Sequence, residues 1–344
     1  MRWLLSVVLL GSASSFSTPP CPCANATLCR RVSPPPRAEV FQFQVAPRNW
    51  PFYDWAALTT VALFGGTGAD ALAGVCHGHA HGVRMVAGAP LSNSPADLRN
   101  ASYIDAFIEG MLAAVNGSAL GVELDGINFD VEGPLSAGAD AAALTAAVAK
   151  TAAAMKRAFG AGFQVSVDVA WSPACIDGRC YDFKGLADAS DLLFVMAYDM
   201  RSQIKPPAPC VASANSPFPG VQEGLLAFAR LGVPAEKLVL GIPWYGYRYP
   251  CLGGTAPGAE VCPIAHVPFR NVSCSDAAGS ELCFSEVKRL LRNGTTRPYT
   301  WDAALAAPTF NRAENGGTVQ FWFDDPRCEF ANQKKPPGPR AQPT

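Results

Sequence analysis

From residue 38 onward, the chain alternates short apolar runs, rich in β-branched and aromatic residues, with segments of helical periodicity. Such alternation is typical of strand-helix units repeated around a parallel sheet. The clearest helical patterns are Ala96–Val115, Ala139–Phe159 and Val221–Leu231. The apolar runs predict seven strands, at Glu39–Val45, Leu58–Phe64, Val83–Ala87, Leu124–Val131, Phe163–Ala170, Leu192–Tyr198 and Leu238–Trp244.

Several of these runs are apolar throughout, as in Leu192–Ala197, which suits strands buried on both faces of a barrel or a doubly wound sheet. No run is followed by the G-x-G-x-x-G pattern of a dinucleotide site, so we expect no such cofactor and favour the barrel. The predicted fold is α/β, of the TIM (β/α)8 type. Gly246 to about Asn315 breaks the rhythm and predicts an insertion after the seventh strand.

The N-terminus indicates export. Residues 1–15 have the pattern of a signal peptide, with Arg2, an apolar run Leu4–Leu10 and then small residues. That run is too short to span a bilayer, so we expect a soluble product without membrane insertion. Charged residues make up only 16% of the chain and the net charge is −1, which excludes the basic stripe that nucleic acid requires.

Twelve cysteines in an exported chain favour disulfides over free thiols or a metal cage, although their pairing cannot be read from sequence. Residues 16–36 form a Cys/Pro-rich segment in which Cys21, Cys23 and Cys29 predict a cross-linked loop. A second cluster lies in the predicted insertion, where disulfides are favoured over zinc. Five N-x-S/T sequons also agree with export; they begin at Asn25, Asn100, Asn116, Asn271 and Asn293.

The segment Asp125–Glu132 (D-G-I-N-F-D-V-E) carries the candidate chemistry. In a strand, Asn128, Asp130 and Glu132 share one face and the apolar residues between them share the other. In a parallel barrel, polar groups at the carboxyl end of a strand lie where active sites form. The two carboxylates have Cα atoms roughly 6.6 Å apart, close enough to couple and raise one pKa. The plainer interpretation is an exposed acidic turn after a buried strand.

This segment resembles the D-G-x-D-x-D-x-E signature of glycoside hydrolase family 18, with Asn128 where most members carry Asp. That variation resembles the chitobiose-cleaving members, as do Cys21-Pro-Cys23, Val169–Pro173, Phe194–Asp199 and Gly241–Gly246. The similarity runs from about residue 21 to Pro326.

The resemblance implies substrate-assisted, retaining hydrolysis, in which the substrate's N-acetyl oxygen attacks the anomeric carbon. It makes Glu132 the proton donor, Asp130 the group that orients the acetamido group, and Tyr198 a hydrogen-bond partner of the acetamido oxygen. Asn128 supports Asp130 as a neutral neighbour. With one like charge fewer, Asp130 is expected to ionise more readily than in a site with three acids.

The roles of four further residues are supported less directly. Asp125 has the opposite strand parity and is predicted to be structural. Asp199 is assigned to substrate binding through the same resemblance. Trp171 and Trp244 fall near strand ends, where they either stack on sugar rings or pack in the core.

The alternating histidines of His77-Gly-His-Ala-His81 offer a possible metal site. We favour a solvated Gly-rich loop there, because no acidic cluster lies nearby in the sequence. We therefore predict neither a metal nor another cofactor.

In the family, the last barrel strand carries a Trp and a final helix follows it, and we find neither. Trp322, in Val319–Pro326, matches an earlier strand. We therefore expect a barrel over 37–326 that is truncated before its last strand, followed by a divergent, disordered tail at 327–344.

The resemblance implies a lysosomal enzyme, expected to be a monomer, that cleaves GlcNAc-β1,4-GlcNAc in glycan cores from the reducing end during glycoprotein breakdown. Its substrate partner would be an N-acetylglucosamine-containing oligosaccharide. Two alternatives remain: a truncated product that is inactive or only binds glycan, and an endo-acting chitinase.

Overall fold

In the computed structural model, residues 19–66, 68–200, 209–269, 272–292 and 299–325 are described. Seven parallel strands form one sheet in sequence order. The sheet curls into a nearly closed barrel, and the ring of Phe43 on the first strand lies 4.7 Å from that of Phe194 on the sixth. The predicted α/β barrel class is confirmed. The strands are β1 (Phe41–Gln44), β2 (Thr60–Leu63), β3 (Arg84–Ala89), β4 (Gly126–Phe129), β5 (Gln164–Ala170), β6 (Leu192–Met196) and β7 (Leu238–Gly241).

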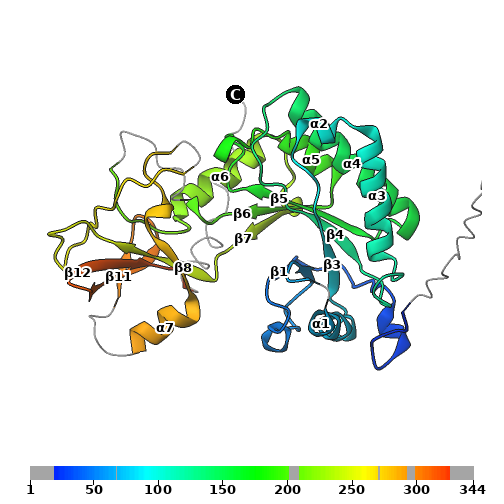
Figure 1. Ribbon diagram of the computed structural model, residues 1–344, viewed down its shortest axis with the longest axis horizontal. Coiled ribbons are helices and arrows are strands. Elements are labelled where there is room, and N and C mark those ends of the chain that lie inside the picture. Colours follow the sequence, from blue (N-terminus) through cyan, green and yellow to red (C-terminus); the bar gives the residue numbers. More distant parts are fainter. Residues whose placement is uncertain (1–18, 67, 201–208, 270–271, 293–298, 326–344) are drawn as a thin grey trace, which may run out of the picture.

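Helices cover the outside of this barrel (Figure 1). They are α1 (Ala69–Ala80), α2 (Pro95–Leu98), α3 (Ala101–Val115), α4 (Ala139–Phe159), α5 (Phe183–Ala189) and α6 (Phe218–Arg230). The predicted helix Ala96–Val115 is two helices, because the Asn100 side chain accepts hydrogen bonds from the Ser102 and Tyr103 amides and begins α3 there. Short 3-10 turns occur at Ala26–Cys29, Trp50–Phe52, Ile176–Gly178, Ala235–Lys237 and Asp276–Ala278.

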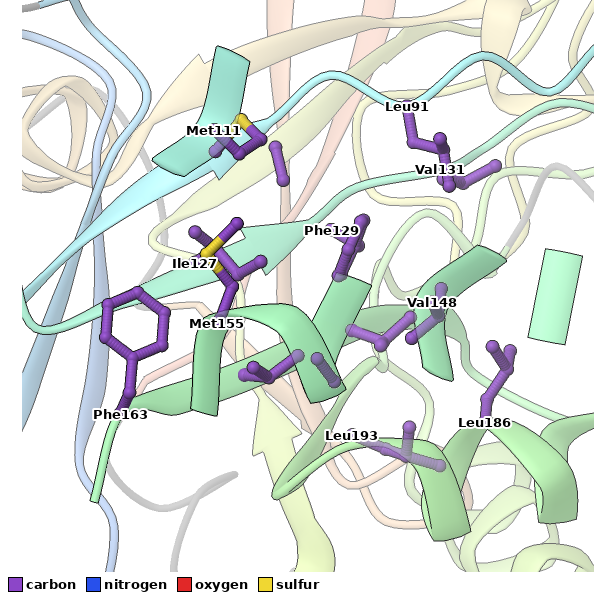
Figure 2. Packing of buried hydrophobic residues seen from close by; sticks show 14 of the residues in the cluster. Leu91, Met111, Ile127, Phe129, Val131, Val148, Met155, Phe163, Leu186 and Leu193 are labelled. Carbon is purple, nitrogen blue, oxygen red and sulfur yellow. The ribbon is translucent and has the colours of Figure 1, made fainter. Parts of the chain in front are cut away.

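The outer face of β4 packs against helices. Ile127 and Phe129 are fully buried and belong to the same core cluster as Met155 and Val148 of α4 (Figure 2). This burial commits one face of the strand to the core, so the alternate residues must face the barrel interior. The predicted alternation in Asp125–Glu132 is therefore observed.

A second, antiparallel sheet lies beside the barrel (Figure 1). Its order is β10 (Thr300–Asp302), β11 (Ala307–Glu314), β12 (Gly317–Trp322), β8 (Tyr245–Pro250) and β9 (Ser280–Cys283), and α7 (Phe284–Arg292) follows β9. The predicted insertion contains β9, β10, β11 and most of β8 of this sheet. Trp322 also belongs to this sheet and pairs with Tyr247 of β8.

Five disulfides cross-link the described residues: Cys21–Cys29, Cys23–Cys76, Cys175–Cys180, Cys210–Cys274 and Cys251–Cys262. The N-terminal loop is thus cross-linked internally and also to α1. Cys283 is exposed and has no disulfide partner among the described residues.

The prediction of a solvated loop at residues 77–81 was wrong. Residues 77–80 are the last turn of α1 and His81 caps it. The ring centroids of His77 and His81, one helical turn apart, lie 4.4 Å from each other, whereas His79 is buried. Helical geometry separates alternate residues by about 200°, so the three imidazoles cannot converge on one point.

The predicted signal peptide and the predicted tail at 327–344 lie outside the described residues. Among the helices that are described, none combines the length and apolar character that a membrane crossing requires.

Candidate active site

The acidic segment lies at the carboxyl end of β4, in the middle of the parallel sheet. Gly126 begins the strand where no side chain fits, since an added Cβ would lie 2.4 Å from the Gln164 carbonyl oxygen of β5. The glycine therefore permits β4 and β5 to approach closely. This pairing places Asn128 opposite Ser166.

Asn128 is fully buried and its amide is fixed by two hydrogen bonds. Its Nδ2 donates to Asp168 Oδ2 at 2.8 Å, and its Oδ1 accepts from Ser166 Oγ at 2.6 Å. Both partners come from β5. The neutral side chain thus connects β4 to a third carboxyl group, which the motif itself does not contain.

Asp130 has its pKa raised to about 6. The main cause is partial loss of hydration, followed by the charge of Glu132, while Arg179 opposes both. Asp130 nevertheless remains exposed to solvent, so its carboxyl group is only partly enclosed by protein atoms. A third carboxyl group nevertheless belongs to this site, because Asp168 supplies on β5 the carboxyl that is missing at position 128. That Asp130 ionises more readily than in a site with three acids stays a prediction.

Glu132 extends from the strand end and is half exposed. Its Oε2 lies 3.2 Å from Arg179 Nη1, and Arg179 Nη2 lies 3.2 Å from Asp177 Oδ2. The side chains of Arg179 and Asp177 are both buried, and both residues lie within the loop that the Cys175–Cys180 disulfide closes. Arg179 therefore connects Glu132 to Asp177 through two salt bridges.

Tyr198 and Asp199 follow β6. Asp199 has a left-handed backbone (φ 53°), which an amide hydrogen bond to Asn215 Oδ1 at 2.7 Å supports. Its Oδ1 accepts hydrogen bonds from the hydroxyls of Tyr245 (2.6 Å) and Tyr247 (3.1 Å). Burial and the surrounding carboxylates raise the pKa of Tyr198, so its hydroxyl stays protonated and can donate.

Several of these groups line a cavity of about 430 Å³, whereas Asn128 and Asp130 lie outside its lining. The barrel contributes Glu132, Trp171, Arg179, Tyr198 and Asp199 to its lining, among others. The second sheet and its connections contribute another wall, which includes Tyr247, Phe269, Asp276 and Glu281. The cavity is thus bounded by both sheets.

One acid of the second wall is strongly perturbed. Burial, together with the charges of Asp199 and Asp177, raises the pKa of Asp276 to about 7. Asp276 is therefore a carboxyl group of this cavity that stays protonated at mildly acidic pH.

The structure separates the two predicted tryptophans. Trp171 lines the cavity, with its indole Nε1 buried and without a partner among the described residues. Trp244 is 66% exposed, lies outside the lining of this cavity and packs against Phe284 of α7.

Asp125 lies at the opposite end of β4 from Glu132. It accepts hydrogen bonds from the Val32 and Met85 amides and contacts the buried ring of His79 at 2.9 Å. Its contacts thus join the N-terminal segment, α1 and β3. The sulfurs of Cys21, Cys23 and Cys29 lie within 4.8 Å of one another, but all three are in disulfides.

Sequence reasoning missed Asp168, Ser166 and Arg179. The first two had a signal, because they alternate with valines in Val165-Ser-Val-Asp-Val169, as the acids do in β4. No sequence pattern pointed to Arg179, because it lies in an irregular loop whose course no periodicity predicts.

The fold and this acidic strand define a barrel glycosidase, and comparison with known proteins agrees. Residues 97–328 match the family model "Glycosyl hydrolases family 18", and the chain belongs to that family.

Its relatives include proteins named di-N-acetylchitobiase. The chain is 41% identical to probable di-N-acetylchitobiase 2 of Dictyostelium discoideum, over 89% of this chain and 79% of that protein. It is 37% identical to the di-N-acetylchitobiase of Mus musculus, over 94% of this chain and 84% of the mouse protein. In three dimensions it resembles the class V chitinase from Nicotiana tobaccum, with a TM-score of 0.63, 19% identity and coverage of 84% and 86% of the two chains.

Proposed function

We propose that this protein hydrolyses the GlcNAc-β1,4-GlcNAc linkage of chitobiose-ended oligosaccharides and releases the reducing-end GlcNAc. The observation that carries this proposal is the pair Asp130 and Glu132 at the mouth of the barrel, beside a cavity lined by Tyr198 and Trp171. The names of the relatives support the choice of substrate.

The proposed reaction uses the substrate's own acetamido oxygen as the nucleophile, so the protein needs no carboxylate for that purpose. Glu132 gives its proton to the glycosidic oxygen as the bond to the leaving sugar breaks. Asp130, ionised at that moment, accepts the acetamido N–H and stabilises the positive charge of the cyclic intermediate. The Tyr198 hydroxyl donates to the acetamido oxygen. Water then opens the intermediate with retention of configuration.

The proposal has a defined pH dependence. The proposed reaction needs one proton on the neighbouring carboxyl groups of Asp130 and Glu132. Since the pKa of Asp130 is raised to about 6, the last proton leaves the pair as the pH rises through that value. We therefore propose an acidic working range, with activity lost above about pH 6.

The wall from the second sheet supports terminal rather than internal cleavage, because Phe269, Asp276 and Glu281 bound the cavity on that side. We also propose that the protein works in the secretory pathway and reaches the lysosome. Its disulfides suit an oxidising compartment during folding, and an acidic organelle suits the carboxyl pair.

The test is to incubate the purified chain with chitobiose-ended oligosaccharides between about pH 3 and 7, the range in which carboxyl groups titrate. We expect GlcNAc release with retained anomeric configuration. Glu132→Gln should lower kcat by about 10²- to 10⁴-fold, because it removes the transferable proton. Glu109→Gln, on the exposed face of α3, is the matched control and should not change kcat.

Other outcomes would favour the alternatives. Internal cleavage of long chitin chains, rather than release of terminal GlcNAc, would identify an endo-acting chitinase. Binding of the oligosaccharide with no GlcNAc released at any pH in this range would identify a glycan-binding protein.

A further inference from the structure

Asp168 lies in the middle of β5, where only 2% of it is exposed. The register of β4 and β5 pairs Asn128 with Ser166 and Phe129 with Val167. Continued by one residue, that register brings Asp130 level with Asp168. Since paired residues of neighbouring strands point to the same side of a sheet, both carboxyl groups face the barrel interior.

The two oxygens of Asp168 have different surroundings. Oδ2 accepts the hydrogen bond from Asn128 Nδ2, whose orientation Ser166 fixes from the other side. Oδ1 is fully buried and has no hydrogen-bond partner among the described residues. A buried carboxylate without a cation is costly, and the group takes up a proton instead. Because Oδ2 already accepts, that proton belongs on Oδ1.

The charged and titratable groups around Asp168 agree with a neutral acid. Burial raises its pKa well above the usual range, and the charges of Asp130 and then Glu132 act in the same direction. The hydrogen bond from Asn128 opposes this rise. Tyr198 faces the same acids from the end of β6, and Arg179 faces Asp130 and Glu132 from the far side of the strand end.

We propose that Asp168 is a positioning residue for Asp130: a buried, neutral carboxylic acid whose Oδ1 has no partner among the described residues of the substrate-free protein. When substrate is bound and Asp130 holds the acetamido N–H, the O–H of Asp168 donates to the Asp130 carboxylate. The proposal deepens the function proposed above and rests on it.

The proton balance of this role is simple. Asp168 keeps its proton throughout, and the proton that protonates the leaving oxygen comes from Glu132. Asp130 must carry a negative charge when the cyclic intermediate forms, and a fixed donor stabilises that charge without reorganisation. Asn128 donates from its Nδ2 to Asp168 instead.

Two substitutions separate this role from simple packing. Asp168→Asn mimics the protonated acid, because its amide oxygen can accept from Asn128 and its NH₂ can donate in place of the O–H. We expect kcat within about threefold of wild type and an unchanged pH profile, since no charge or donor is lost. Asp168→Leu has a similar size but no donor, so kcat should fall by about tenfold or more with little change in KM.

The matched control is Asp191→Asn, at the amino end of β6. Asp191 also binds the β5 backbone, through the Val165 amide, but it lies at the opposite end of the barrel. It should change thermal stability without changing kcat or the pH profile.

Infrared difference spectra of wild type minus Asp168→Asn test the protonation directly and need no activity. We expect a protonated-carboxyl band at neutral pH that the variant lacks. An absent band would overturn the proposal, even if the Leu variant does not fold.

Activity can overturn it independently. Wild-type kcat in a folded Asp168→Leu would do so. The proposal would also be overturned if the alkaline limb of the pH–activity profile moved to lower pH in Asp168→Asn. Such a shift would mean that Asp168 is ionised in the wild type. If wild type itself releases no GlcNAc, the proposed function fails instead, and the infrared band still reports the state of Asp168.

Discussion

Arg179 is the cation that faces the acid pair, and it is shared between Glu132 and Asp177. Its charge lowers the pKa of Asp130, against the effects of lost hydration and of Glu132. The charge of Arg179 thus lowers the pH at which Asp130 loses its proton. The salt bridge to Arg179 also restricts the rotation of the Glu132 side chain in the cavity.

Arg179→Gln should therefore move the alkaline limb of kcat/KM to higher pH. The sign follows from charge: without the guanidinium, ionised Asp130 is less stable, its pKa rises, and the singly protonated pair persists further. A pH series of kcat/KM measures the shift. Arg230→Gln, which removes an exposed ion pair with Glu223 on α6, is the control and should leave the limb in place. A downward shift or none in the Arg179 variant contradicts the prediction.

At the scale of elements, the His79–Asp125 contact connects α1 to the start of β4. Both ring nitrogens of His79 face acceptors, Nδ1 the Leu28 carbonyl at 2.7 Å and Nε2 the Asp125 carboxylate at 2.9 Å. Burial lowers the pKa of His79, but Asp125, the Leu28 carbonyl and Glu123 together outweigh it, and the net pKa is raised. The doubly protonated ring therefore satisfies both partners at acidic pH.

His79→Gln should destabilise the protein most at low pH, by about 3 kcal/mol, because it leaves Asp125 buried without its partner. A raised pKa in the folded state stabilises the fold fully below the unfolded value of about 6.5. That contribution is lost as the pH rises through the folded-state pKa of His79. The difference in unfolding free energy between wild type and variant should therefore become smaller with rising pH. Thermal unfolding across this range measures it, with exposed His81→Gln as the control. A gap that widens with pH would refute the assignment.

At the scale of the whole molecule, the N-terminal segment is held against the barrel by contacts distant in sequence. Arg31 donates to the carbonyls of Leu124 and Val115, and Cys23 is bonded to Cys76 in α1. These contacts cover the side of the barrel remote from the cavity. They therefore affect stability rather than the chemistry.

Replacing Cys23 and Cys76 together by Ser should lower the free energy of unfolding by about 4 kcal/mol, from the entropy of a chain loop with this separation of 53 residues. Denaturant unfolding at fixed pH measures the loss. Cys283→Ser is the control: this exposed cysteine forms no disulfide within the described part of the chain, and its replacement should leave stability unchanged. A double variant as stable as wild type would show that the noncovalent contacts of Arg31 suffice.

The barrel could be predicted because each parallel strand carries its own apolar run, and burial of that run is a local property of the sequence. The alternation of Ile127 and Phe129 with Asn128 and Asp130 likewise follows from strand geometry alone. The separation of the histidines could not be anticipated from an assumed loop, since it follows from the helical twist of α1.

The sequence by itself thus determined the fold class and the acidic strand, because both depend on periodicity within a short segment. Only the tertiary structure decided the charge balance around Asp130. Asp168 comes from a neighbouring strand and Arg179 from a loop, and their effects depend on burial and on contacts across the barrel. The pKa of a carboxyl group depends on everything packed near it, and residues distant in the sequence supply much of that surrounding.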